Sequence, residues 1–142
     1  MASTAEAAPQ GAPLSRLGFA PGQVVQEIGW DDDVDNGLRF AVEDVTTTDL
    51  EDEDYGDVAD AVLVWFRDGD GDLVDLLVDC LTNLADDGFL VLCTPKAGRR
   101  VHVQAAEVEE SAVTAGLHAA GTANGSPDWA TVRLVSPKSQ RR

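Results

Sequence analysis

The sequence is poor in basic residues and contains no long hydrophobic run. Only 10 Lys and Arg stand against 26 Asp and Glu in 142 residues. Because binding to nucleic acid or to an anionic membrane needs clustered cations that release counterions, direct contact with either is not expected. The longest uninterrupted apolar run, Ala61–Phe66, is far shorter than the roughly 20 residues of a membrane-spanning helix.

Cysteine and the common catalytic motifs are also scarce. Cys80 and Cys93 are the only cysteines, and twelve residues separate them, so neither a zinc motif nor a redox pair is indicated and we expect two buried thiols. The sequence has no HExxH motif and no GxSxG nucleophile elbow. His102 and His118 have no partner at metal or catalytic spacing. We therefore predict no metal site, no catalytic residue and no cofactor.

The length and composition favour one soluble domain. With 44% hydrophobic residues, a chain of this size can bury about 65–70% of its unfolded surface without disulfides. Residues Met1–Pro13 lack the basic start and apolar stretch of a secretory signal. We expect residues 1–13 to be a disordered tail, residues 14–136 to fold, and residues 137–142 to be a short basic tail of a cytoplasmic protein.

The negative charge is concentrated in the first two thirds of the chain. Residues 1–95 carry 22 acidic and three basic residues, whereas residues 96–142 carry four acidic and seven basic residues. Half of the acidic residues lie between Asp31 and Asp60. Such a stretch can serve as a solubilising surface, an adaptation to salt, or a face that recognises a basic partner. Solvation is the default interpretation, and Asp32, Asp33 and Asp35 form the candidate partner face.

The hydrophobic pattern predicts strands that alternate with helices. Continuous apolar runs indicate strands buried on both faces, and apolar residues at i, i+3 and i+4 indicate amphipathic helices. The expected elements, in order, are a strand ending at Ile28, a helix from Asp32 capped by Asp31–Asp33, a strand at Ala61–Phe66, a helix with a stripe from Leu73 to Leu84 ended by Gly88, a strand at Phe89–Thr94, a helix at Ala105–Ala115, and an antiparallel pair, Leu117–Ala123 and Trp129–Val135, around an Asn124-Gly125 turn.

This order defines an α/β domain with a mostly parallel sheet and a C-terminal antiparallel strand pair. Three segments, LGFAPGQVV, LADDGFLVLCTPKAG and TAGLHAAGTANGSPDWATVRLVSPK, resemble the actinobacterial family of uncharacterised proteins known as domain of unknown function 3052. The resemblance covers residues 15–138, and TPKAG and DWATVRLV are its most specific parts. It implies a truncated Rossmann-like fold related to class I methyltransferases, with no assigned activity.

Ligands of open α/β sheets bind outside the carboxyl ends of the strands, and two segments are expected at that edge. The first segment is Gly29, Trp30 and Asp31. The second follows a buried strand, contains three bases within five residues, and consists of Thr94, Pro95, Lys96, Arg99 and Arg100. Together the two segments form the candidate crevice for a ligand or partner. The alternative for the basic segment is an ordinary exposed loop whose cations pair with nearby Asp.

The first turn departs from a nucleotide-binding or methyl-donor turn. It contains a single glycine, the Trp30 ring stands where a ligand should approach the backbone, and three consecutive Asp would repel the phosphates of a dinucleotide. Only 32 residues separate Ile28 from Ala61, where the resemblance implies two further strands and a helix in a complete methyltransferase core. The site therefore reads as degenerate.

The remaining motifs favour structural roles. Asp68–Asp72 has the spacing of a calcium loop, but Leu73 occupies the sixth position, where the sharp turn requires Gly. Asp70 or Asp72 as a helix N-cap explains the same residues. Trp65 lies inside an apolar strand and is expected in the core, whereas Trp129 fits either the core or the rim of a crevice.

Three functions remain open. The preferred hypothesis is a non-catalytic, acidic, cytoplasmic interaction or regulatory domain that meets a basic protein partner. The alternative is a protein or methyltransferase-like enzyme that binds S-adenosylmethionine or a nucleotide between Gly29-Trp30 and Thr94-Pro95-Lys96. A third is an acidic surface that imitates DNA. Homo-oligomerisation is compatible with each of them.

Overall fold

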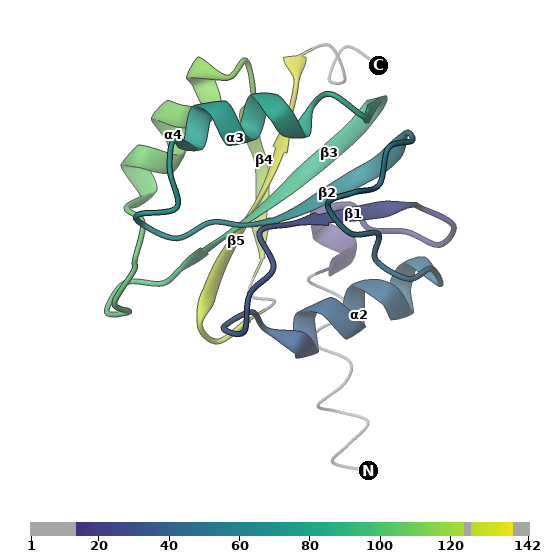
Figure 1. The fold of residues 1–142 in the computed structure, drawn as a ribbon, viewed down its shortest axis with the longest axis horizontal. Helices are drawn as coiled ribbons and strands as arrows, with labels where there is room; N and C mark the ends of the chain where they lie inside the picture. The colour runs from purple at the N-terminus through teal and green to yellow at the C-terminus, as the bar shows by residue number, and fades with distance from the viewer. Residues whose placement is uncertain (1–13, 124–125, 138–142) are drawn as a thin grey trace.

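A five-stranded mixed sheet runs through the molecule (Figure 1). The computed structural model describes residues 14–123 and 126–137, so the two predicted tails and the Asn124-Gly125 turn lie outside it, except for Pro137. The first three strands are parallel, and the last two run antiparallel to their neighbours, which confirms the predicted α/β fold. In spatial order the strands are β1 (Val25–Ile28), β2 (Ala59–Trp65), β3 (Leu84–Pro95), β5 (Trp129–Val135) and β4 (His118–Ala123).

Helices cover both faces of the sheet (Figure 1). Helix α2 (Asn36–Thr46) lies on one face, while α3 (Leu73–Cys80) and α4 (Ala105–Thr114) lie on the other. Side chains of β2 point alternately to the two faces and are buried on both, as expected of a central parallel strand. No helix in the described part of the chain is long and apolar enough to cross a membrane.

The start of α2 differs from the prediction. The helix begins at Asn36 rather than near Asp32, and Asp35 is its N-cap, with its carboxylate accepting a hydrogen bond from the Leu38 N–H at 3.1 Å. The Asp33 carboxylate is instead bound by Arg67, which lies far along the chain. A long-range ion pair thus delays the helix beyond the first acidic residues.

The connection from α2 to β2 protects the free edge of β1. Glu51 forms an isolated parallel bridge with this edge: its N–H donates to the Val25 carbonyl at 2.9 Å, and its carbonyl accepts from the Glu27 N–H at 2.7 Å. The Gln26 side chain then donates to the backbone carbonyls of Asp52 and Tyr55, each at 3.2 Å. Because this short segment pairs with the edge of β1, no further strand is needed there, and the 32 residues between Ile28 and Ala61 are enough to connect β1 to β2.

Helix α3 is shorter than its leucine stripe predicted. It ends at Cys80, and Gly88 is not its C-cap but part of β3. A Cβ atom at Gly88 would lie 2.8 Å from the Asp60 carbonyl and 2.7 Å from the Leu84 side chain, so the glycine is required by close packing of β3 against β2. Leu84 already belongs to the sheet, where it pairs with Ala59.

The other elements follow the prediction closely. Helix α4 is followed by Gly116, which has a left-handed φ of +87°. Both cysteines are free and buried. Trp129 is in the core, 1% exposed, with its ring 4.9 Å from that of Trp65 in an edge-to-face arrangement. This contact decides between the core and the rim for Trp129.

Candidate functional site

The edge formed by the carboxyl ends of β1 and β2 is closely packed. Gly29 directly follows β1 and has a φ of +85°. A Cβ atom at this position would lie 2.2 Å from the Trp65 carbonyl oxygen of β2. The missing side chain of Gly29 therefore allows the two strand ends to approach each other.

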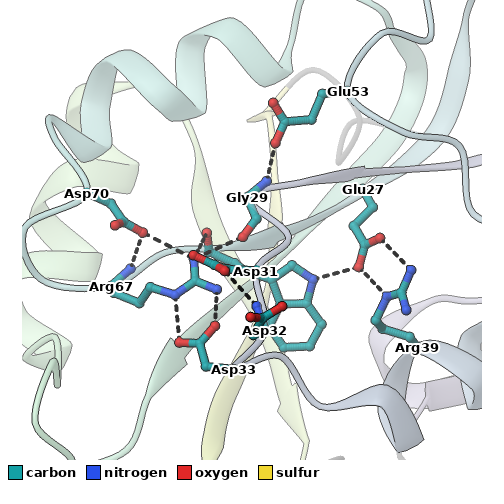
Figure 2. Close-up of polar contacts among 10 residues, drawn as sticks. Glu27, Gly29, Asp31, Asp32, Asp33, Arg39, Glu53, Arg67 and Asp70 are labelled. Atoms are coloured by element: carbon teal, nitrogen blue, oxygen red, sulfur yellow. Dashed lines mark hydrogen bonds and ion pairs between the residues drawn. The ribbon is translucent and has the colours of Figure 1, made fainter.

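Arg67 fills the space beside these strand ends (Figure 2). It follows β2, is only 9% exposed, and donates from Nε to Asp33 Oδ2 at 2.9 Å and from Nη2 to Asp33 Oδ1 at 2.5 Å. Its Nη1 atom donates to the Gly29 carbonyl at 2.9 Å and to Asp70 Oδ2 at 3.2 Å. The guanidinium carbon lies 5.3 Å from the centre of the Trp129 ring. Arg67 thus connects the loop after β1, which contains Gly29 and Asp33, and the loop after β2, which contains Asp70, to Trp129 of β5.

The network holds its members in their charged forms. The hydrogen bond with Asp33 raises the pKa of Arg67, and the same bond lowers the pKa of Asp33 below its ordinary value of 3.8. Burial opposes both changes, and the charge of Arg67 adds to the decrease at Asp33. Arg67 and Asp33 therefore remain an ion pair at neutral pH.

A second buried ion pair lies next to the first (Figure 2). Glu27, in β1, is 6% exposed and accepts hydrogen bonds from Arg39 Nε at 2.7 Å and Nη2 at 3.0 Å. Trp65 Nε1 donates to the same carboxylate at 2.8 Å. Glu53 accepts a bond from the Gly29 N–H at 2.7 Å and fixes the turn from outside. Glu27, Arg39 and Arg67 are not among the residues predicted from the sequence, although the scarcity of bases in residues 1–95 distinguishes Arg39 and Arg67.

The predicted acidic residues fall into two groups. Asp33 and Asp35 have structural roles, as the partner of Arg67 and as the N-cap of α2. Asp31 and Asp32 are exposed, and the Asp31 carboxylate accepts a bond from the Asp32 N–H at 2.7 Å. Trp30 is 52% exposed beside them. Two of the acidic residues and one tryptophan are thus available to solvent in this turn.

The basic loop after β3 lies against a different feature, a cavity of about 490 Å³. Thr94 and Lys96 line this cavity, whereas Gly29, Trp30 and Asp31 do not. Arg99 instead pairs with Asp128 at 3.3 Å, as the simpler interpretation of the loop expects.

Pro95 and Arg100 complete the predicted set. The Pro95 carbonyl accepts a bond from His102 Nδ1 at 2.8 Å, and Arg100 is exposed. The structure therefore brings Thr94 and Lys96 together at the cavity and keeps the Gly29–Asp31 turn outside its lining. Among residues 14–123 and 126–137, no group of three His, Cys, Asp or Glu side chains is placed to hold a metal ion.

Asp68–Asp72 forms part of the network rather than a calcium loop. Asp72 is the N-cap of α3 and accepts a bond from the Asp75 N–H at 3.0 Å, which confirms one of the two predicted caps. Asp70 accepts bonds from the backbone and side chain of Arg67.

The fold belongs to the class I methyltransferase-like type. The mitomycin 7-O-methyltransferase MmcR is 14% identical and superposes over 93% of this chain and 54% of that chain, with a TM-score of 0.62. The pyocyanin biosynthetic protein PhzM is 15% identical over 89% of this chain and 53% of that chain, with a TM-score of 0.63. The chain thus spans about half the length of these two proteins.

Within this class, residues 14–138 match the family described as protein of unknown function (DUF3052), and the chain belongs to that family. The uncharacterized protein Rv2239c of Mycobacterium tuberculosis is 47% identical over 125 residues, which cover 88% of this chain and 78% of that protein. A relative from Mycobacterium bovis matches with the same identity and coverage. The family resemblance of the three sequence segments is confirmed.

Proposed function

We propose that this protein is a non-catalytic, cytoplasmic interaction domain that uses a methyltransferase-like fold as a scaffold. Its exposed acidic turn at Asp31 and Asp32 contacts a basic protein partner and thereby regulates it. The observation that carries the proposal is the position of Arg67, which is bound to Asp33, Gly29 and Asp70 at the carboxyl ends of the strands, the edge at which open α/β sheets bind ligands.

The residues at this edge do not fit a methyl donor. A related fold, the magnesium protoporphyrin IX methyltransferase of Synechocystis, has bound SAM, at 12% identity to this chain. Ligands of open α/β sheets lie outside the carboxyl ends of the strands. Here the Gly29 backbone is in close contact with Trp65, and the Arg67 guanidinium is bound to Gly29 and Asp33. The sulfonium of S-adenosylmethionine is a cation, which the acidic residues of this edge would not repel, so the objection to a methyl donor is one of space rather than charge.

Exposed aromatic residues support the interaction role. Trp30 is 52% exposed next to Asp31 and Asp32, and Phe40 on α2 is 59% exposed. Large aromatic side chains provide much of the binding energy at protein interfaces, and Trp is among the most enriched. Exposed carboxylates around such an anchor would speed the encounter with a basic partner and select against acidic ones.

The closed edge is tested by calorimetric titration of the protein with S-adenosylmethionine, S-adenosylhomocysteine and adenosine nucleotides. We expect no binding heat and no change in melting temperature. A ligand at a hundredfold excess over its Kd would stabilise the fold by about 2.7 kcal/mol. Stabilisation of that size by any of these ligands would refute a closed edge.

The partner surface is tested by quantitative affinity capture from an actinobacterial lysate. The test variant combines Asp31→Lys and Asp32→Lys, because Asp33 and Asp35 have structural roles. A matched control, Asp79→Lys with Asp87→Lys, makes the same charge change on exposed residues of α3 and of the amino-terminal part of β3. We expect basic proteins to be lost from the test variant only. If both variants retain the same proteins, or the wild type captures none, the acidic turn serves solubility alone.

A further inference from the structure

A hollow in the structure lies between α4 and the antiparallel pair β4–β5. Its volume of about 490 Å³ falls within the range of small-molecule sites. The walls are mostly apolar: Val108 and Ala112 come from α4, and Val132 and Leu134 come from β5. Small side chains such as Ala130 and Ala119 leave this space open. It lies apart from the Arg67 network and from the acidic turn.

One hydroxyl group lines this cavity without a hydrogen-bond partner in the described residues. Thr94 is only 5% exposed, and its side chain makes no hydrogen bond within the described part of the chain. It lies in β3 opposite Ala130 of β5, so the two residues share the face that borders the cavity. Because this hydroxyl makes no bond within the protein, it is free to donate to or accept from a polar atom of a ligand in the cavity.

One cation lines the same cavity without a counter-ion. Lys96 makes no ion pair with any residue in the described ranges, although the chain has 26 acidic residues. Neighbouring Arg99, in contrast, pairs with Asp128. The Lys96 N–H donates to the Asp128 carbonyl at 3.0 Å, and the His102 ring fastens the far end of the loop to Pro95. The backbone that carries Lys96 is therefore held in place before any ligand arrives.

From these contacts we infer that the cavity binds a small amphipathic monoanion, with an aromatic or aliphatic body against the apolar walls and a carboxylate between Lys96 and the Thr94 hydroxyl. An anion is favoured because Lys96 lacks a carboxylate from the protein, and a single charge because the rest of the lining is mainly apolar. The other titratable groups of the lining are Glu109, His102 and His118. Glu109 is exposed on α4, and its negative charge would oppose the anion.

The inference is tested with 2-naphthoate as probe and 2-naphthalenemethanol as its neutral counterpart, by titration followed through methyl NMR of the wild-type protein. For a probe of this size we expect a Kd of about 1 mM or below. The shifts should be centred on Val108, Val132 and Leu134. The neutral probe should bind about tenfold more weakly, the loss expected when one charge-assisted contact is missing.

Two variants that change a charge in the cavity lining should change the affinity for naphthoate in opposite directions. Lys96→Met keeps the aliphatic stem and should weaken naphthoate binding about tenfold without affecting the neutral probe. Glu109→Gln should strengthen naphthoate binding. Arg100→Met is the matched control, because Arg100 is an exposed cation of the same loop that does not line the cavity. It should leave both affinities unchanged.

A variant that fills the cavity tests whether the probes bind inside it. Ala130→Leu places a larger side chain opposite Thr94 and should abolish binding of both probes, while circular dichroism verifies the fold. Equal affinity for the charged and neutral probes, equal losses for Lys96→Met and Arg100→Met, or shifts outside the cavity would each overturn the inference. Failure of this binding leaves the partner surface at Asp31 and Asp32 untouched, because the two experiments concern separate residues.

Discussion

Replacing Gly29 by Ala tests whether the strand-end edge is closed. The new Cβ atom would lie 2.2 Å from the Trp65 carbonyl oxygen, whereas such contacts are essentially never shorter than 3.0 Å. The two strand ends must therefore separate by most of an ångström. That movement would weaken the bonds from Arg67 to the Gly29 carbonyl and from the Gly29 N–H to Glu53.

Gly22 provides a matched control. Its φ of +87° is nearly that of Gly29, at +85°, but a Cβ atom there would meet nothing within 4 Å. The left-handed backbone alone costs an Ala residue about 1–2 kcal/mol, which both variants share. The clash and the weakened charged hydrogen bonds add about 2–3 kcal/mol at Gly29 only.

Urea unfolding followed by circular dichroism measures both variants. We expect losses in the free energy of unfolding of about 3–5 kcal/mol for Gly29→Ala and about 1–2 kcal/mol for Gly22→Ala. For a domain of this size, the extra 2 kcal/mol corresponds to a decrease of roughly 8 °C in melting temperature. Equal losses for the two variants would mean that the strand ends have room to separate and that this edge is not closed to a ligand.

Two further predictions concern buried charges and thiols. Arg39→Ala leaves the Glu27 carboxylate buried without its cation and should cost about 3 kcal/mol in urea unfolding, most of it recovered when Glu27→Gln is added; a loss below about 1 kcal/mol would contradict the burial of this pair. Burial and nearby acidic groups raise the pKa of the Cys80 thiol to about 12, and burial raises that of Cys93 as well, so at pH 8 both should react with a thiol reagent only as fast as the protein unfolds. Rapid labelling of either cysteine in the native protein would show that it is accessible.

Local patterns in the sequence were sufficient for most of the fold. Apolar runs such as Ala61–Phe66 are too long and too uniform to lie anywhere except in a buried strand, and they predicted β2 and β3. The boundaries that failed depend on contacts between distant residues. Asp31–Asp33 are good helix caps by sequence, but Asp33 is bound by Arg67 and the helix is capped by Asp35 instead. Gly88 resembles a helix terminator, but its position is explained by the approach of β3 to Asp60.

The site was predictable only in part, for the same reason. Lys96 and Thr94 could be singled out because residues that follow a buried parallel strand lie at the edge where ligands bind. Glu27 looked like an ordinary polar residue within a short strand, since its partner Arg39 comes from a helix and Trp65 from another strand. Only the packing of these three elements shows that the carboxylate is buried.

The internal ion pairs change the meaning of the acidic half of the chain. Two of the three bases in residues 1–95, Arg39 and Arg67, bind Glu27, Asp33 and Asp70 within the fold. These pairs leave the exposed surface of that half with carboxylates and almost no cations. Lys96, in contrast, has no acidic partner among the described residues and lines a cavity. A basic macromolecule and a small anion would therefore be drawn to different places on one molecule, because the fold neutralises Arg39 and Arg67 in one half and leaves Lys96 available at the cavity in the other.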